Sequence, residues 1–267
     1  MSSAISGKNG RFYANADGLD NAETIWTTGA GSSIVSQITG KVGTYAVRST
    51  TTAAGANVLL MYHDFASNNI STWTAVVFWV RSSVNTSAGD LQLLLDNTSA
   101  CASPLESMNI PALTANTWTR VLLRFATPAN LTAVISVGLK QVTDLADGTF
   151  DVDDVRVIRK VAETTEWSLT FTGDTVDVTS FDSSGWHENL ATLKQWNATW
   201  NVLKTAAPMS EFGTEAVVAF EENDTVGRAW VGNLIINNAN ETISATGAAV
   251  AYSYSGIGTG ELQAPVA

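Results

Sequence analysis

The sequence has few of the residues that disulfide, metal or acid–base chemistry requires. Its 267 residues include one cysteine, Cys101, and two histidines, His63 and His187. A single cysteine excludes an internal disulfide and a cysteine-based zinc site, so we expect Cys101 to be a buried thiol. We expect both histidines in structural or solvated roles, His63 at the end of a strand and His187 on the exposed side of a short helix.

Motifs of catalysis are missing as well. The chain contains no G-x-S-x-G elbow, no H-E-x-x-H helix and no phosphate-binding loop. A glycosidase needs two opposed carboxylates, and one sequence cannot exclude such a pair, but no other feature of a glycosidase accompanies it. We predict that the protein is not an enzyme, and keep a hydrolase on a β-sheet scaffold as a minor alternative.

Long apolar segments are absent. No apolar run approaches 18 residues, and the first residues, MSSAISGKNGRFY, lack the basic start and the apolar core of a signal peptide. We therefore expect no membrane insertion, and a protein that is made in a cytoplasm and kept there until assembly or lysis.

Charge is sparse and uneven. The formal net charge is −11, and residues 161–267 hold 13 acidic against 3 basic residues, a charge of −10. A protein that grips nucleic acid needs clustered Lys and Arg to displace phosphate counterions, and no such cluster is visible. The acidic excess serves either to repel a polyanion or only to keep the protein soluble.

Strand-forming residues dominate what is present. Thr, Ser, Val, Ala and Gly are frequent, and short strands are predicted between turns. Between residues 16 and 156 they are Tyr45–Arg48, Val58–His63, Ala75–Arg81, Leu91–Leu95, Thr119–Phe125, Val134–Lys140 and Phe150–Val157. This spacing is typical of an antiparallel two-sheet sandwich.

One stretch, residues 166–200, changes its pattern twice. Apolar residues alternate at 167, 169 and 171, and the phase shifts by one residue after Gly173-Asp174, which predicts a turn or a bulge. Beyond it, Ser183 or Ser184 can cap a helix in which Trp186, Leu190 and Leu193 are spaced i, i+4 and i+7. Trp196, Ala198 and Trp200 then predict a further strand.

The same stretch resembles a known family. The order W-S-L (167–169), D-T-V-D-V-T-S-F (174–181) and G-W-x-E-x-L-x-x-L-K-x-W (185–196) resembles the tail tube proteins of long-tailed, siphovirus-type bacteriophages. The resemblance covers residues 5–13 and 157–262, including the strand Ala248–Tyr254 and the G-I-G-T-G ending at 256–260. The continuity expected between these two parts is broken by about 140 residues, as when a domain is inserted at an exposed turn.

The insert has a resemblance of its own. F-W-V-R (78–81), W-T-R-V (118–121) and F-D-V-D-D-V-R-V (150–157) resemble jelly-roll carbohydrate-binding and galactose-binding-like modules. That resemblance implies a structural calcium held by Glu23 and Asp153, the alternative being solvated acids at a strand end. Trp26 and Trp73 lie near turns and are candidate platforms for a glycan, whereas Trp79 and Trp118 are expected in the core.

We therefore predict an all-β fold in two domains. Residues 1–15 and 157–267 form a tail-tube-type sandwich or barrel with one short α-helix, and residues 16–156 form an inserted antiparallel jelly-roll. The first resemblance implies a structural virion protein, whose hexameric rings stack into a tail tube around a tape-measure protein, contact other tail proteins, conduct DNA and display the insert outside. Five acids are candidates for the lumen: Asp174, Asp177, Glu221, Glu222 and Asp224. The alternative is a glycan-binding protein, with host-surface glycans as partners, in which the jelly-roll is the functional module.

Overall fold

The computed structural model describes residues 10–52, 55–179, 182, 186–203, 212–222, 229–242 and 251–265. In these residues the regular secondary structure is almost entirely β-strand, which confirms the predicted all-β class. None of the helices in this part of the chain has the length and apolarity needed to cross a membrane. The chain divides into two compact units. Unit 1 comprises Met1–Lys160, Ala219–Val231 and Gln263–Ala267, and unit 2 comprises Val161–Val218 and Gly232–Leu262.

Unit 1 is built from eleven consecutive strands and two short 3₁₀ turns. The strands are β1 (Arg11–Asp20), β2 (Thr27–Thr28), β3 (Ile34–Thr39), β4 (Tyr45–Thr51), β5 (Val58–Asn68), β6 (Ala75–Ser82), β7 (Leu91–Asp96), β8 (Glu106–Asn109), β9 (Thr119–Arg124), β10 (Val134–Gln141) and β11 (Gly148–Lys160). The turns are η2 (Ser99–Cys101) and η3 (Pro128–Asn130). All seven strands predicted between residues 45 and 157 are present, and the short strands β2, β3 and β8 were not predicted.

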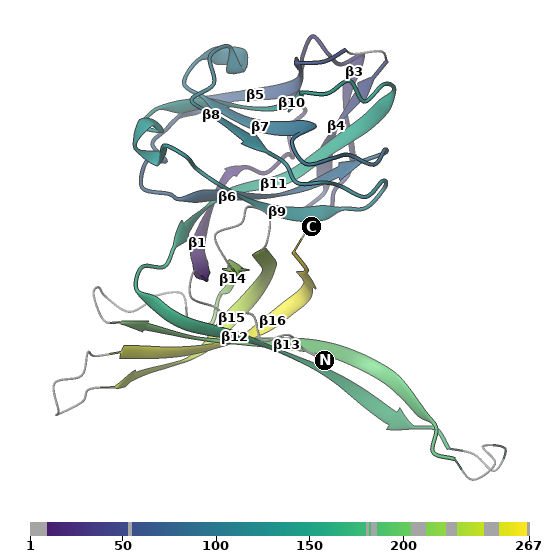
Figure 1. Ribbon diagram of the computed structural model, residues 1–267, viewed down its shortest axis with the longest axis vertical. Helices are drawn as coiled ribbons and strands as arrows, with labels where there is room; N and C mark the ends of the chain where they lie inside the picture. The colour runs from purple at the N-terminus through teal and green to yellow at the C-terminus, as the bar shows by residue number, and fades with distance from the viewer. Residues whose placement is uncertain are drawn as a thin grey trace. The chain divides into compact units, whose positions relative to one another are not determined.

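These strands form a two-layer sandwich (Figure 1). One layer, sheet B, has the order β2-β5-β10-β7-β8. The other layer is formed by β3, β4, β11, β6 and β9, which belong to the eleven-stranded sheet A. A single apolar cluster lies between the layers and includes Phe78, Leu93, Val137 and Phe150, none of which is exposed. Burying a side chain of this size stabilises the fold by about 1.5–3 kcal/mol, so this cluster is the main source of the stability of unit 1.

Strand β11 organises sheet A. It pairs with β6 along one edge, and with β4 and then β1 along the other. The predicted domain boundaries at 15/16 and 156/157 both fall inside strands, because β1 and β11 continue past them in register from Asp20↔Val155 to Tyr13↔Lys160. The next strand, β14 (Glu215–Glu221), pairs with β1 in the register Phe12↔Phe220, so unit 1 also takes in Ala219–Val231.

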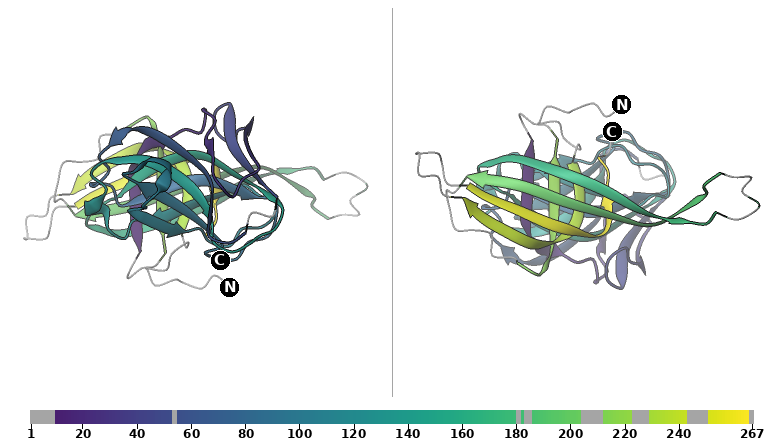
Figure 2. Two further views of the ribbon diagram at one scale, coloured as in Figure 1. Left: turned by 90° about the horizontal axis from the view of Figure 1, so that it is seen from above. Right: turned by 90° about the horizontal axis from the view of Figure 1, so that it is seen from below.

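Unit 2 contains further strands of sheet A. They lie in the order β12 (Thr164–Asp177), β13 (Asn189–Leu203), β16 (Ala251–Gln263) and β15 (Ala229–Thr242), followed by residues 215–218 of β14 (Figure 2, right). The alternation predicted at Trp196, Ala198 and Trp200 is confirmed, because all three are buried. Trp200 stacks on Tyr254 with ring centroids 5.5 Å apart.

One glycine of the G-I-G-T-G ending, Gly258, makes room for a tryptophan. A Cβ atom at Gly258 would lie 2.0 Å from the Trp196 ring, so only glycine lets β16 pass this closely. Trp196 Nε1 also donates to the Gly260 carbonyl oxygen at 3.1 Å. This packing is the physical reason for glycine at position 258.

The predicted helix over residues 186–194 is wrong. From Asn189 the chain forms β13, which pairs with β12 in a register that includes Val176↔Leu190 and Phe171↔Trp196. A long antiparallel pair satisfies backbone groups along the whole ribbon, and this tertiary pairing overrides the helical spacing of Trp186, Leu190 and Leu193. The predicted irregularity after Gly173-Asp174 is confirmed as a register shift between Gly173 and Thr175.

Candidate functional site

The β12–β13 ribbon and the residues next to the ends of its strands carry the largest group of exposed apolar side chains among the described residues. Its members, the apolar ribbon, are Phe171, Val176, Val178, Trp186, Leu190 and Leu193, with exposed fractions of 57%, 52%, 46%, 78%, 59% and 73%. Soluble monomers rarely expose large contiguous apolar patches, and such patches mark sites of association.

The ribbon is also an open edge. β12 is the terminal strand of its sheet in the described part of the chain, and the two strands continue beyond β15 and β16 as a two-stranded arm (Figure 2). An exposed edge strand offers backbone donors and acceptors to another chain, and isolated monomers normally protect such edges. The two-stranded arm and the open edge of β12 together suit hydrogen-bonded pairing with a strand of a second polypeptide.

Two of the five lumen candidates lie on this ribbon. Asp174 and Asp177 are exposed on β12. Asp177 accepts a hydrogen bond from the Thr179 backbone N–H at 2.9 Å and lies 3.4 Å from His187 Nδ1. The Thr179 hydroxyl, the Thr179 N–H and His187 lower the pKa of Asp177, so this carboxylate is charged at neutral pH.

The other three candidates lie elsewhere. Glu221 is 1% exposed, and its carboxylate is enclosed within unit 1, which corrects its prediction as a candidate for the lumen. Glu222 is half-buried and accepts a hydrogen bond from Trp230 Nε1 at 3.0 Å. Asp224 lies outside the described residues.

The Glu221 carboxylate joins three strands of unit 1. Tyr13 on β1 donates its hydroxyl to Oε2 at 3.0 Å, and Arg124 on β9 places Nε 3.4 Å from Oε1. Arg11 Nε lies 4.0 Å from Oε2. Burial and the Glu221 charge raise the pKa of the Tyr13 phenol well above its usual value. The role of Glu221 is therefore to fix β14 to β1 and β9.

Glu23 and Asp153, the candidate calcium ligands, hold one loop instead. Glu23 Oε1 accepts the Thr44 backbone N–H at 2.7 Å, and Asp153 Oδ2 accepts those of Lys41 and Val42 at 2.7 and 2.9 Å. Backbone N–H groups occupy positions around the carboxylates that a calcium ion would need for oxygen ligands. No group of three or more carboxylates, histidines or cysteines suited to a metal occurs in the described residues. The arrangement fits calcium poorly.

Asp153 is itself unusual. It is fully buried, and its second oxygen, Oδ1, has no hydrogen-bond partner. Burial raises the pKa of its carboxyl to about 6, against the lowering effect of the Lys41 and Val42 N–H groups.

Neither candidate glycan platform has an open ring. Trp26 is 2% exposed, donates Nε1 to Asp20 Oδ1 at 3.3 Å and stacks on His63, so its place in the core corrects its prediction as a sugar platform. Trp73 is half-buried against the core, and the Arg159 guanidinium lies 4.3 Å from its ring centroid.

Cys101 and His63 have the structural surroundings that the sequence predicted. Cys101 is 6% exposed, and burial raises the pKa of its thiol to about 11. His63 Nδ1 makes a short hydrogen bond with Asp20 Oδ2. The His63 ring is thereby fixed against the core of unit 1.

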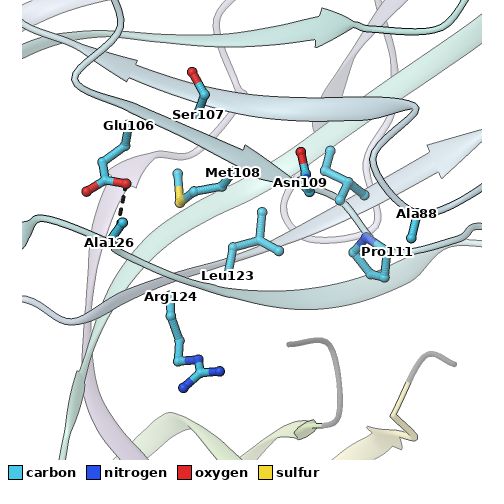
Figure 3. Close-up of a pocket in the computed structure, with 10 residues that line it drawn as sticks. Ala88, Glu106, Ser107, Met108, Asn109, Pro111, Leu123, Arg124 and Ala126 are labelled. Atoms are coloured by element: carbon cyan, nitrogen blue, oxygen red, sulfur yellow. Dashed lines mark hydrogen bonds between the residues drawn. The ribbon is translucent and has the colours of Figure 1, made fainter. Parts of the chain in front are cut away.

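A cavity of about 440 Å³ opens between β8 and β9, the terminal strands of the two layers. Met108 and Leu123 point toward one another across it, whereas Arg124 points away (Figure 3). The Glu106 carboxylate at its end accepts the N–H groups of Ala126 and Thr127 at 3.2 and 2.6 Å. No aromatic ring is among its lining residues, so the cavity offers an apolar wall and no surface for stacking a sugar. The sequence analysis did not predict this cavity, because β8, which forms one of its walls, was not predicted.

Comparisons with known proteins give two groups of solved structures. The tail of an empty gene transfer agent particle with C6 symmetry is 19% identical, with a TM-score of 0.35 over 40% of this chain and 85% of that one. The family 11 carbohydrate-binding module of cellulosomal cellulase Lic26A-Cel5E of Clostridium thermocellum is 14% identical, with a TM-score of 0.42 over 55% of this chain and 95% of that module. No family model matches the chain, and no curated protein does. Similarity at this level does not assign a family or a function.

Proposed function

We propose that the chain is a structural subunit of a bacteriophage tail, forming hexameric rings that stack into a tube through which DNA is delivered. The sequence resemblance over residues 157–262 suggests this role. In the proposal unit 2 builds the tube with tape-measure and other tail proteins, unit 1 is displayed outside, and no catalysis is required. The subunit is made in the host cytoplasm and ends in the virion.

The single observation that carries the proposal is the apolar ribbon. Six large apolar side chains gather on one two-stranded arm, and four of them are more than 55% exposed. Covering half of the surface of a Leu or Phe contributes about 1 kcal/mol. In a closed ring of identical subunits every interface repeats the same contact. The arm of each subunit would therefore be covered by the neighbouring subunit.

The acids of unit 2 suit a bore for DNA. Asp174 and Asp177 are both exposed on β12. Carboxylates repel the phosphate backbone, whereas Lys and Arg would bind it and slow its transit. We propose that these two acids line the bore.

Electron microscopy of the purified chain tests the proposal. We expect rings or tubes in negative stain. Assembly should increase as salt rises from about 50 to about 500 mM, because salt screens the repulsion between subunits whose residues 161–267 carry a charge of −10. A protein that stays monomeric at high concentration in high salt contradicts the proposal.

A glycan-binding role for unit 1 is the second candidate. Its two-layer antiparallel sandwich is an architecture that many sugar-binding domains share, which makes this a fold-level analogy. Binding of a glycan by a chain that never forms rings would favour this role over the tail subunit.

A further inference from the structure

Both layers of unit 1 end at the cavity beside β8. β8 is the terminal strand of sheet B, and β9, in the other layer, is hydrogen-bonded to β6. Every residue from Glu106 to Pro111 lines the cavity, which therefore follows the whole length of β8. The cavity is a groove along the edge of a strand, and no part of the proposed function uses it.

The backbone of β8 presents alternate residues to this groove. The Ile110 N–H donates to the Leu91 carbonyl oxygen at 2.9 Å, so these two residues form a hydrogen-bonded pair. Such pairs recur at every second residue of an antiparallel ladder, so Met108 also directs its N–H and C=O toward β7. The N–H and C=O groups of Ser107 and Asn109 consequently point away from β7, along the groove. An edge of this kind is a template for one more strand.

The floor of the groove is apolar. Met108, Ile110 and Leu123 belong to the core cluster between the layers, and none is more than 6% exposed. Met108 and Leu123 point toward one another across the cavity (Figure 3). Methionine side chains adapt to the shape of what packs against them. The volume of about 440 Å³ lies within the range of ligand sites, roughly 300–1,000 Å³, so a large apolar side chain can enter between the layers.

The charge at one end of the groove is negative. The Glu106 carboxylate is buried and accepts hydrogen bonds from the Ala126 and Thr127 N–H groups, and it has no ion pair within the described part of the chain. Arg124 also lines the cavity, but its side chain points away and is paired with Glu221 (Figure 3). A buried carboxylate without a cation is stabilised by a cation placed beside it. The groove therefore favours a ligand with a basic group over one with an acidic group.

We propose that the edge of β8 binds an extended, basic and apolar peptide segment of a partner protein, which adds one strand to sheet B. The backbone of the segment pairs with Ser107 and Asn109 in antiparallel orientation. A large aliphatic side chain fills the cavity between Met108 and Leu123, and a Lys or Arg side chain lies near Glu106. In this mode of recognition main-chain bonds supply affinity, and pockets for alternate side chains supply specificity. The proposal concerns unit 1 alone and does not depend on tail assembly.

Calorimetry of the full chain with the blocked peptide KLTLTLK tests the interaction. Its Leu side chains share one face of a strand and can turn toward the cavity, while its Thr residues then direct their backbone toward β8. N-methylation of both Thr residues removes the N–H groups that pair with β8, whereas N-methylation of the second and third Leu residues removes the same number from the far side. We expect at least about tenfold weaker binding of the Thr-methylated peptide and less than about threefold weaker binding of the Leu-methylated one.

Matched variants locate the contact on β8. Ser107→Pro removes a backbone donor that points into the groove and reduces the affinity by about fivefold or more, whereas Ser107→Ala keeps that donor and changes the affinity less than about twofold. Glu106→Gln reduces the affinity for KLTLTLK by about threefold or more and leaves that for the neutral peptide QLTLTLQ unchanged. Circular dichroism and melting temperature confirm that each variant is folded, and the N-methylated peptides give the same test on the wild-type chain.

Amide hydrogen exchange with saturating peptide shows where the strand is added, and we expect slower exchange at Ser107 and Asn109. Four results would overturn the proposal. One is no binding of KLTLTLK at about 1 mM. Another is equal binding of the Thr-methylated peptide, which would mean that the groove takes apolar groups without strand pairing. The third is slower exchange at β12, the open edge of unit 2, and not at β8. The last is self-association of the wild-type chain that Ser107→Pro abolishes, which would assign the groove to a second copy.

Discussion

Replacement of Asp153 by asparagine should make unit 1 more stable at neutral pH. The carboxyl is fully buried, and its pKa is about 6, against an ordinary value of 3.8. A difference of about two pKa units corresponds to about 3 kcal/mol between the protonated and charged forms. Between pH 4 and 6 the folded chain thus binds more protons at this site than the unfolded chain does, so the free energy of unfolding falls as pH rises.

Asparagine removes this dependence and keeps an acceptor for the Lys41 and Val42 N–H groups. We expect Asp153→Asn and wild type to be about equally stable at pH 4, with the variant more stable by about 2–3 kcal/mol at pH 7.5. Urea unfolding of the full chain, followed by tryptophan fluorescence at both values, measures the difference. Asp144→Asn is the matched control, because this exposed carboxylate accepts one local N–H bond, from Ala146 at 2.9 Å. A stability difference that does not grow with pH, or that favours wild type as pH rises, would show that the buried Asp153 carboxyl does not titrate in this way.

Three further predictions concern single side chains. Gly258→Ala should destabilise unit 2 by about 1–3 kcal/mol in a urea titration, because its Cβ would meet the Trp196 ring, whereas Gly173→Ala, whose Cβ has 3.9 Å to its nearest neighbour, should change stability little. Cys101, with its pKa raised to about 11, should react with a thiol reagent at pH 8 far more slowly in the folded than in the urea-unfolded chain. Tyr13 should ionise only well above the pH at which an exposed tyrosine does, as followed by absorbance at alkaline pH.

The sandwich could be predicted because each of its strands carries its own signal. Ala75–Arg81 and Val134–Lys140 are apolar runs of strand length between turn residues, and that local pattern is sufficient to place them. β8 was missed because Glu106–Asn109 has only four residues with no apolar run. Short edge strands depend on the neighbour with which they pair, and one sequence does not contain that information.

The helix error has a related cause. Trp186, Leu190 and Leu193 are spaced like a helical face, yet the chain there belongs to a strand whose partner, β12, begins more than 20 residues earlier. Site residues were harder still to predict. Glu221 stands beside Glu222 in a charged segment, and nothing local distinguishes the one that contacts Tyr13 in the interior from the half-buried one.

The ion pairs of Asp151 could not be predicted from the sequence. Arg48, Arg81 and Asp151 meet only because β4, β11 and β6 are neighbours in sheet A. Strand order is a property of the tertiary fold, and no pattern within one strand contains it.

Sedimentation velocity can show whether the apolar ribbon of unit 2 joins subunits into rings, as we propose. Leu190→Lys together with Leu193→Lys places two charges on the ribbon, and both positions are more than half exposed, so the subunit should remain folded. Ile25→Lys, at a residue of unit 1 that is 50% exposed, is the matched control. The account predicts ring-sized particles for wild type and Ile25→Lys, and monomers for the double ribbon variant. Ring-sized particles of the ribbon variant in the same proportion as wild type would contradict it.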